Sequence, residues 1–191
     1  MTTQSQFSGG FSEAPIQAAH AFRAAMTAMA RPGEIRSLTG GLPPKPLSVA
    51  AGTLLLTLCD PETNVYLAGS ADTPAVRQWL TFHTGAPATG AADADFAVGT
   101  WQDLGQLTAY RTGTAEYPDR SATLIVECAE LVNAGATLSG PGIRDVARLS
   151  LPDIPALQAN SSLFPLGCDF FFTCGSKVAA LPRSTTIRSE G

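Results

Sequence analysis

The stretch that decides the fold reads Phe164-Pro-Leu-Gly-Cys-Asp169-Phe-Phe-Phe-Thr-Cys174-Gly-Ser-Lys177-Val-Ala-Ala-Leu181-Pro-Arg183. Its three consecutive phenylalanines place aromatic rings on both faces of a strand, so we expect that strand to be covered on both sides. Gly175-Ser176 separates two apolar runs, which fits a two-residue turn with glycine at the first central position. The stretch therefore predicts a β-hairpin.

Helices and strands are both expected outside the hairpin. Apolar residues recur at three- and four-residue steps from Ile16 to Met29, which predicts an amphipathic helix that ends at Arg31-Pro32-Gly33. Further helices are expected over 47–58, 74–84, 102–107 and 154–163, and strands over 65–67, 96–98 and 124–126. This order predicts an α/β chain, or an α+β one, with one mixed sheet.

Length and composition favour one domain with a protein partner. A chain of 191 residues can bury one sizeable core. We expect a flexible N-terminal segment over 1–14 and a single α/β domain over 15–191. Only 15% of the residues are charged, which indicates that part of the surface meets another protein, although a general bias toward small residues is the alternative.

Charge and hydropathy argue against several classes of protein. The net charge is −4 and no basic stripe is present, which argues against nucleic acid as the main partner. The polar start, Met1-Thr-Thr-Gln-Ser-Gln6, does not read as a secretory signal. The longest apolar stretch, around Leu54-Leu55-Leu56, is too short to cross a bilayer. We therefore expect a cytoplasmic protein without a membrane anchor.

The residues that usually bind metals show no ligand spacing. The cysteines match no zinc or iron–sulfur motif, and the only histidines are His20 and His83. We expect no metal site and interpret the thiols as buried free cysteines. The four cysteines are Cys59, Cys128, Cys168 and Cys174.

His83 is the candidate for acid–base catalysis. It lies in Phe82-His83-Thr84-Gly85, at the expected end of a helix, where the helix dipole favours a cationic imidazole. A structural hydrogen-bonding histidine is the alternative.

Three residues around the hairpin are candidate ligands for a phosphorylated substrate. Asp169 and Arg183 lie at the open end of the hairpin and can pair across the strands. Their pairing is either a structural ion pair or the setting of a phosphate-binding arginine. Thr185 belongs to a hydroxyl-rich run after Arg183, which suits phosphate and also a polar chain end. Gly140-Pro141-Gly142 is interpreted as a structural turn rather than a phosphate loop, because proline offers no amide.

Several blocks of the sequence, taken together, carry a resemblance to a known protein family. No elbow, paired-carboxylate or HExxH motif of a known catalytic class occurs in the chain. The blocks extend from about Gln17 to Thr186 and are the following: Phe22-Arg23-x-x-Met26-x-x-Met29-Ala30-x-Pro32-Gly33, Leu54-Leu-Leu-Thr-Leu58-x-Asp60, Phe82-His83-Thr84-x-Ala86-Pro87, Leu138-Ser-Gly140-Pro-Gly142-Ile143, Phe164-Pro-Leu-Gly167-x-Asp169, Cys174-Gly175 and Leu181-Pro182-Arg183-Ser184-Thr185. Together they resemble one protein family, the H subunit of the bacterial carbon–phosphorus lyase system, which breaks down phosphonates.

The resemblance implies a subunit of a core complex with the G, I and J subunits and a homodimer when isolated. That core transfers the ribose 5-triphosphate unit of ATP to an alkylphosphonate, with loss of adenine. Any contact with ATP or phosphonate is expected only within the complex. The resemblance also implies a fold like that of pyridoxal-phosphate-dependent transferases, three-layer-like and without the cofactor.

The lysines agree with a chain that carries no pyridoxal cofactor. A Schiff base needs a desolvated lysine, but Lys45 lies among prolines and Lys177 opens a hairpin strand. We therefore expect a non-catalytic or accessory subunit, with its dimer surface on the early helices. A catalytically participating subunit that uses His83 and Arg183, or a stand-alone transferase, is the alternative.

Overall fold

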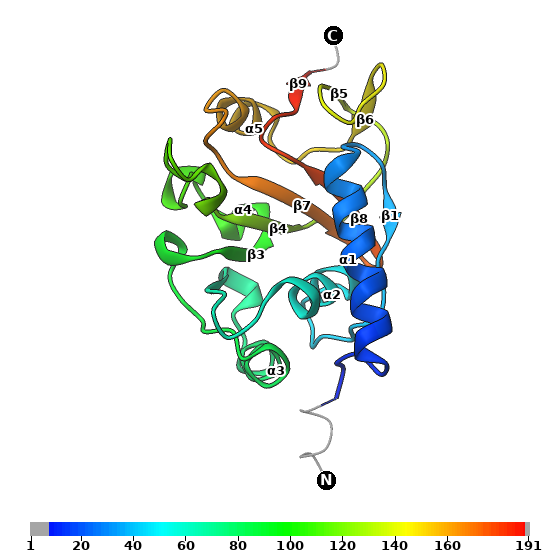
Figure 1. Ribbon diagram of the computed structural model, residues 1–191, viewed down its shortest axis with the longest axis vertical. Coiled ribbons are helices and arrows are strands. Elements are labelled where there is room, and N and C mark those ends of the chain that lie inside the picture. The colour runs from blue at the N-terminus through cyan, green and yellow to red at the C-terminus, as the bar shows by residue number, and fades with distance from the viewer. Residues whose placement is uncertain (1–7, 190–191) are drawn as a thin grey trace.

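A six-stranded mixed sheet forms the centre of the computed structural model, which describes residues 8–189 (Figure 1). The strand order is β1-β8-β7-β4-β3-β2. The four strands from β7 to β2 are parallel to their neighbours, whereas β8 and β1 run antiparallel. The strands are β1 (Arg36–Ser37), β2 (Val65–Leu67), β3 (Phe96–Thr100), β4 (Thr123–Glu127), β7 (Asp169–Cys174) and β8 (Lys177–Leu181).

The β7–β8 hairpin confirms the prediction from the phenylalanine run. Cys174 pairs with Lys177, which leaves the two-residue turn, and Gly175 has the positive φ of +60° that such a turn requires. Phe171 packs in the core on one face of the sheet, whereas Phe170 and Phe172 pack in the core on the other. The strand is covered on both sides, as expected.

Three helices cover one face of the sheet, and their ends follow the local sequence. Ser48 and Thr73 cap the second and third helices by accepting hydrogen bonds from Ala51 N and Val76 N. Gly85, with a φ of +71°, ends the third helix. The three are α1 (Ala14–Ala30), α2 (Val49–Leu58) and α3 (Pro74–Thr84).

The other face is covered by shorter elements and a second sheet. This sheet is antiparallel with the order β6-β5-β9, whereas the sequence predicts a single mixed sheet. Its strands are too short for their hydrophobic alternation to be recognised. The elements on this side are α4 (Trp101–Leu104), α5 (Ile154–Ser161), β5 (Ala136–Ser139), β6 (Ala147–Leu149) and β9 (Thr186–Arg188). The connections hold short 3₁₀ helices: η1 (Gly69–Ala71), η2 (Ala91–Asp93), η3 (Leu107–Ala109) and η4 (Pro118–Arg120).

Helix α1 is present as predicted, but its large apolar side chains do not form its buried face. The buried residues are Ala21, Ala25 and Ala28, and α1 lies against α2 and β8. Phe22 and Met26 are each 51% exposed. Alanine allows a helix to approach its neighbours closely, so the small residues face inward, Phe22 and Met26 remain at the surface, and only Met29 among the large apolar side chains packs partly against the core.

The first described residues lie against this body of the protein. Leu42 N donates to Gly9 O over 2.8 Å, and Phe11 packs against the core. Residues 1–7 of the expected flexible segment 1–14 lie outside the described residues. Within residues 8–189, no helix is long and apolar enough to cross a membrane.

Candidate functional site

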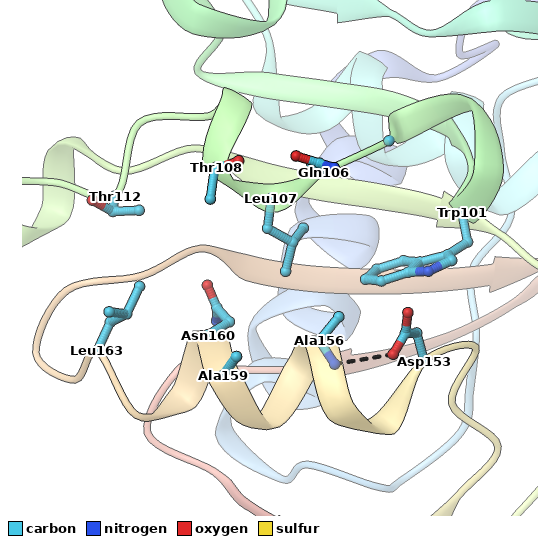
Figure 2. A pocket seen from close by; sticks show the side chains of 11 residues that line it. Trp101, Gln106, Leu107, Thr108, Thr112, Asp153, Ala156, Ala159, Asn160 and Leu163 are labelled. Atoms are coloured by element: carbon cyan, nitrogen blue, oxygen red, sulfur yellow. Dashed lines mark hydrogen bonds between the residues drawn. The ribbon is translucent and has the colours of Figure 1, made fainter.

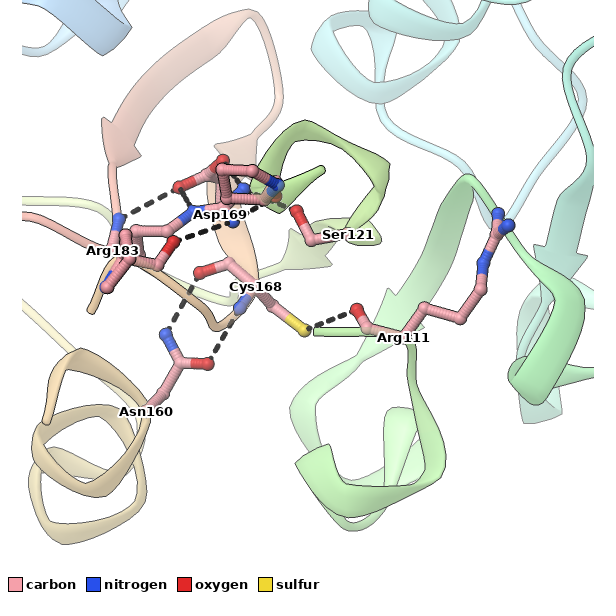
Figure 3. A network of polar contacts seen from close by, with 8 residues as sticks. Arg111, Ser121, Asn160, Cys168, Asp169 and Arg183 are labelled. Carbon is pink, nitrogen blue, oxygen red and sulfur yellow. Dashed lines mark hydrogen bonds and ion pairs between the residues drawn. The ribbon is translucent and has the colours of Figure 1, made fainter. Parts of the chain in front are cut away.

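Asp169 and Arg183 form an ion pair at the open end of the hairpin (Figure 3). Asp169 Oδ1 accepts from the backbone N of Arg183 over 2.8 Å and from its Nε over 3.1 Å. Arg183 Nη2 donates to Asp169 Oδ2 over 2.5 Å. The two side chains are only 12% and 23% exposed, so the pair is largely removed from water.

The remaining donors of Arg183 bind the chain as well. Nη2 also donates to the hydroxyl of Ser121, and Nη1 donates to Pro118 O over 2.7 Å and to Pro165 O over 3.5 Å. A guanidinium offers five N–H groups, and here each has an acceptor within the protein. The arrangement joins the β8 end, the η4 turn and the segment before β7. Binding of a phosphate at Arg183 requires the release of one of these contacts.

Thr185 is buried beside the glycine turn that follows β5. It is 1% exposed, and its Oγ1 has no hydrogen-bond partner in the described part of the chain. A Cβ on Gly140 would lie 3.7 Å from the Cα of Thr185, and one on Gly142 would lie 1.9 Å from the carbonyl oxygen of Ala30. Gly142 therefore has no room for a side chain, and Gly140 has a φ of +130° that residues with side chains rarely adopt, which supports the interpretation of this segment as a structural turn.

His83 lies elsewhere, in the last turn of α3. Its Nε2 is 3.4 Å from Ser8 O, and its ring contacts Trp79 and Phe82 with centroid distances of 5.4 and 4.9 Å. It lines a hollow of about 460 Å³ together with Phe11. The residues that contact His83 and those that contact Arg183 do not overlap, so these candidates do not form one site.

Glu127 is a perturbed carboxyl group that the sequence interpretation missed. It ends β4, where its Oε1 accepts from Ser48 N over 2.6 Å and its Oε2 accepts from Thr173 Oγ1 over 2.9 Å. Burial raises the pKa of Glu127 above its ordinary value. The carboxyl ends of parallel strands are the usual ligand edge of an α/β sheet, so an acidic residue that ends an apolar strand is the signal that could have located it.

An apolar hollow of about 490 Å³ lies between α5 and the segment from α4 to Thr112 (Figure 2). Two of its polar neighbours are engaged in the fold: Asp153 Oδ1 caps α5 by accepting from Ala156 N, and Asn160 binds the backbone N and O of Cys168. The indole of Trp101 packs 6.3 Å from the ring of Phe170. The hollow is therefore suited to an apolar side chain or a flat ring.

The thiols and lysines occupy ordinary structural positions. Cys59 and Cys168 are buried, and burial raises their pKa values to about 12 and about 11. No group of three or more His, Cys, Asp or Glu side chains in residues 8–189 is placed to hold a metal ion. Lys45 and Lys177 are exposed, an arrangement unlike that of a lysine desolvated beneath a pyridoxal ring.

Comparison with known proteins identifies the family. Residues 9–188 match the family described as bacterial phosphonate metabolism protein (PhnH). The chain belongs to this family. A relative from Rhizobium meliloti (strain 1021) is 39% identical in an alignment of 203 positions that covers the full length of both chains. That relative is α-D-ribose 1-methylphosphonate 5-triphosphate synthase subunit PhnH. The family resemblance deduced from the sequence blocks is confirmed.

Proposed function

We propose that this PhnH-family chain is a subunit of α-D-ribose 1-methylphosphonate 5-triphosphate synthase and works in phosphonate catabolism. The observation that carries the proposal is the 39% identity to such a subunit over the full length of both chains. The reaction that the family resemblance implies joins the ribose 5-triphosphate unit of ATP to an alkylphosphonate and releases adenine.

The proposed role is that of an accessory subunit, non-catalytic by itself. The candidate acid–base residue His83 and the candidate phosphate ligand Arg183 have no contact residue in common. All five N–H donors of Arg183 bind the protein itself, which favours a structural role. We propose the same structural role for Thr185 and Asp169. The second candidate function is that of a subunit that participates in catalysis.

The proposed partners are the G, I and J subunits and a second copy of the chain. Phe22 and Met26 lie one turn apart on α1, and both are about half exposed. Large apolar side chains that gather on an exposed helix commonly mark a protein interface. We propose that this part of α1 contributes to the dimer contact. We also propose that the protein is cytoplasmic and that its fold is similar to that of pyridoxal-phosphate-dependent transferases.

Genetic replacement tests the proposed function. A phosphonate-using bacterium that lacks its own H subunit should regain growth on methylphosphonate as sole phosphorus source when it expresses this chain. Growth on inorganic phosphate is the control for general fitness. Failure to grow on methylphosphonate, with the chain soluble and bound to the host G, I and J subunits, would contradict the proposal. A His83→Ala variant separates the two roles: the accessory role predicts growth like that of the unchanged chain.

A further inference from the structure

A hollow of about 350 Å³ lies between α1 and the edge strand β1, and every ionisable side chain that lines it is basic. In a chain with a net charge of −4, this is a local reversal of sign. The lining consists of His20, Arg23, Ala24 and Thr27 from α1 and Arg36 and Ser37 from β1.

The α1 side of the hollow follows from helical spacing. His20, Arg23 and Thr27 are separated by three and four residues, so they lie on one face of the helix. A rise of about 1.5 Å per residue makes this row about 10 Å long. The row is longer than a single phosphate group and is comparable to an extended chain of phosphates.

Several donors around this hollow have no partner in the described part of the chain, in contrast to those of Arg183, although the Thr27 hydroxyl donates to Arg23 O. Within residues 8–189, neither the Arg23 guanidinium nor the His20 imidazole has a hydrogen-bond or ion-pair partner. The Nε of Arg36 is buried and has no acceptor. A buried donor without a partner is unfavourable in the free protein, and an anion in the hollow can satisfy it.

One carboxylate lies close to the hollow without lining it. Glu34 Oε2 accepts from Arg36 Nη2, and Glu34 Oε1 lies 3.6 Å from Arg31 Nη1. These side chains are 38–60% exposed, so the pairs are weak and solvated. The Glu34 carboxylate therefore repels an anion in the hollow only moderately, and it leaves the Nε of Arg36 without an acceptor.

We propose that this hollow binds the linear polyphosphate of a nucleoside or ribosyl 5-triphosphate, with Arg23 and Arg36 as the principal ligands. Guanidinium groups bind phosphate oxygens through paired N–H donors, and two of them on opposite sides of the hollow, Arg23 on α1 and Arg36 on β1, favour several linked phosphates over one. The choice of a triphosphate as ligand class rests on the proposed synthase function. The hollow itself rests on the geometry alone.

Isothermal titration calorimetry at low ionic strength tests this site. The probes are inorganic tripolyphosphate, inorganic phosphate and adenosine, each added to the purified full chain. We expect tripolyphosphate to bind more tightly than phosphate, adenosine not to bind, and added salt to weaken the binding. Absence of tripolyphosphate binding, or equal affinity for tripolyphosphate and phosphate, would overturn the proposal.

Matched substitutions locate the site. Arg23→Ala should weaken tripolyphosphate binding about tenfold, the effect of losing one charge-assisted contact. Glu34→Gln should tighten binding, because it removes the opposing charge. Arg77→Ala is the control, since the exposed Arg77 pairs with Asp72 on α3. Equal weakening of binding in Arg23→Ala and Arg77→Ala would show that the affinity for tripolyphosphate depends on the overall charge of the protein, and the site would be rejected. Circular dichroism verifies that each variant is folded.

The outcomes separate this site from the proposed function. If the chain restores growth on methylphosphonate but does not bind tripolyphosphate, the site is wrong and the proposed function stands. If the chain binds tripolyphosphate at Arg23 but does not restore growth, the proposed function fails and a polyphosphate site remains.

Discussion

The hairpin end of the central sheet and the α1–β1 edge use the same residue type in opposite ways. At the hairpin, Arg183 binds Asp169, Ser121 and two backbone carbonyls, and its side chain is 12% exposed. At the α1–β1 edge, the Arg23 guanidinium has no hydrogen-bond or ion-pair partner among the described residues, and the Nε of Arg36 is buried without an acceptor.

This difference distinguishes residues that stabilise the fold from residues that are available to a ligand or partner. A side chain whose donors are all satisfied contributes to stability and costs free energy to redirect. An unsatisfied donor at the surface contributes little to stability and retains its capacity to bind.

Removal of a hairpin aromatic should give the largest loss of stability. Phe172 is completely buried and stacks on Phe170 with a centroid distance of 6.1 Å. We expect Phe172→Ala to lower the free energy of unfolding by about 3–5 kcal/mol, because it leaves a cavity in the core. Urea denaturation measures the change. Phe82→Ala is the matched control, since Phe82 is 55% exposed and should change stability little.

Arg183→Ala should give the next largest loss. The substitution leaves the carboxylate of Asp169 without its counter-ion and two carbonyl oxygens without donors, for which we expect a loss of about 2–4 kcal/mol. Arg23→Ala should alter the free energy of unfolding by less than about 0.5 kcal/mol. Comparable losses in the two variants would remove the distinction between the two regions.

Glu127 should give a smaller effect that depends on pH. Because burial raises its pKa in the folded protein, the native state holds the proton more tightly than the unfolded chain. The contribution of Glu127 to stability is therefore present at low pH and falls as pH rises from the unfolded pKa through the folded one. Glu127→Gln should remove this titration and gain stability relative to the unchanged chain as the pH rises above the ordinary pKa of a glutamic acid.

Urea midpoints at several pH values measure the Glu127 effect. The exposed Glu130 provides the control, since Glu130→Gln should leave the pH profile unchanged. A Glu127→Gln profile parallel to that of the unchanged chain would contradict the assignment of the titration to Glu127.

The smallest effect on stability should come from α1. Phe22→Ser replaces an exposed aromatic ring and should change the free energy of unfolding by less than about 0.5 kcal/mol. It should nevertheless shift the dimer toward monomer if this part of α1 forms the dimer contact. Light scattering after size-exclusion chromatography measures the mass. An unchanged dimer in Phe22→Ser would place the contact elsewhere.

The sequence predicts the elements whose signals are local. The hairpin, the helix over 74–84, and the strands at 96 and 124 are confirmed because each depends on alternation, turn chemistry or capping within a few residues. The separate β6-β5-β9 sheet is not predicted, since its strands hold three or four residues and pair over long separations.

The site is less predictable than the fold because partners are not visible in a sequence. The pairing of Asp169 with Arg183 follows from hairpin register, but the additional acceptors at Ser121 and Pro118 come from a distant turn. Arg23 has the same appearance as any helical arginine in the sequence. Its significance emerges only when Arg36 is placed beside it and both are found to have free donors.

Reconstitution of the synthase from purified subunits tests the central claim most directly. Formation of ribose 1-methylphosphonate 5-triphosphate from ATP and methylphosphonate can be followed by phosphorus NMR with this chain alone, with its partner subunits alone, and with all of them together. We predict product only in the complete mixture. Product from this chain alone, or equal product when it is omitted, would contradict the account of an accessory subunit that the assembly requires.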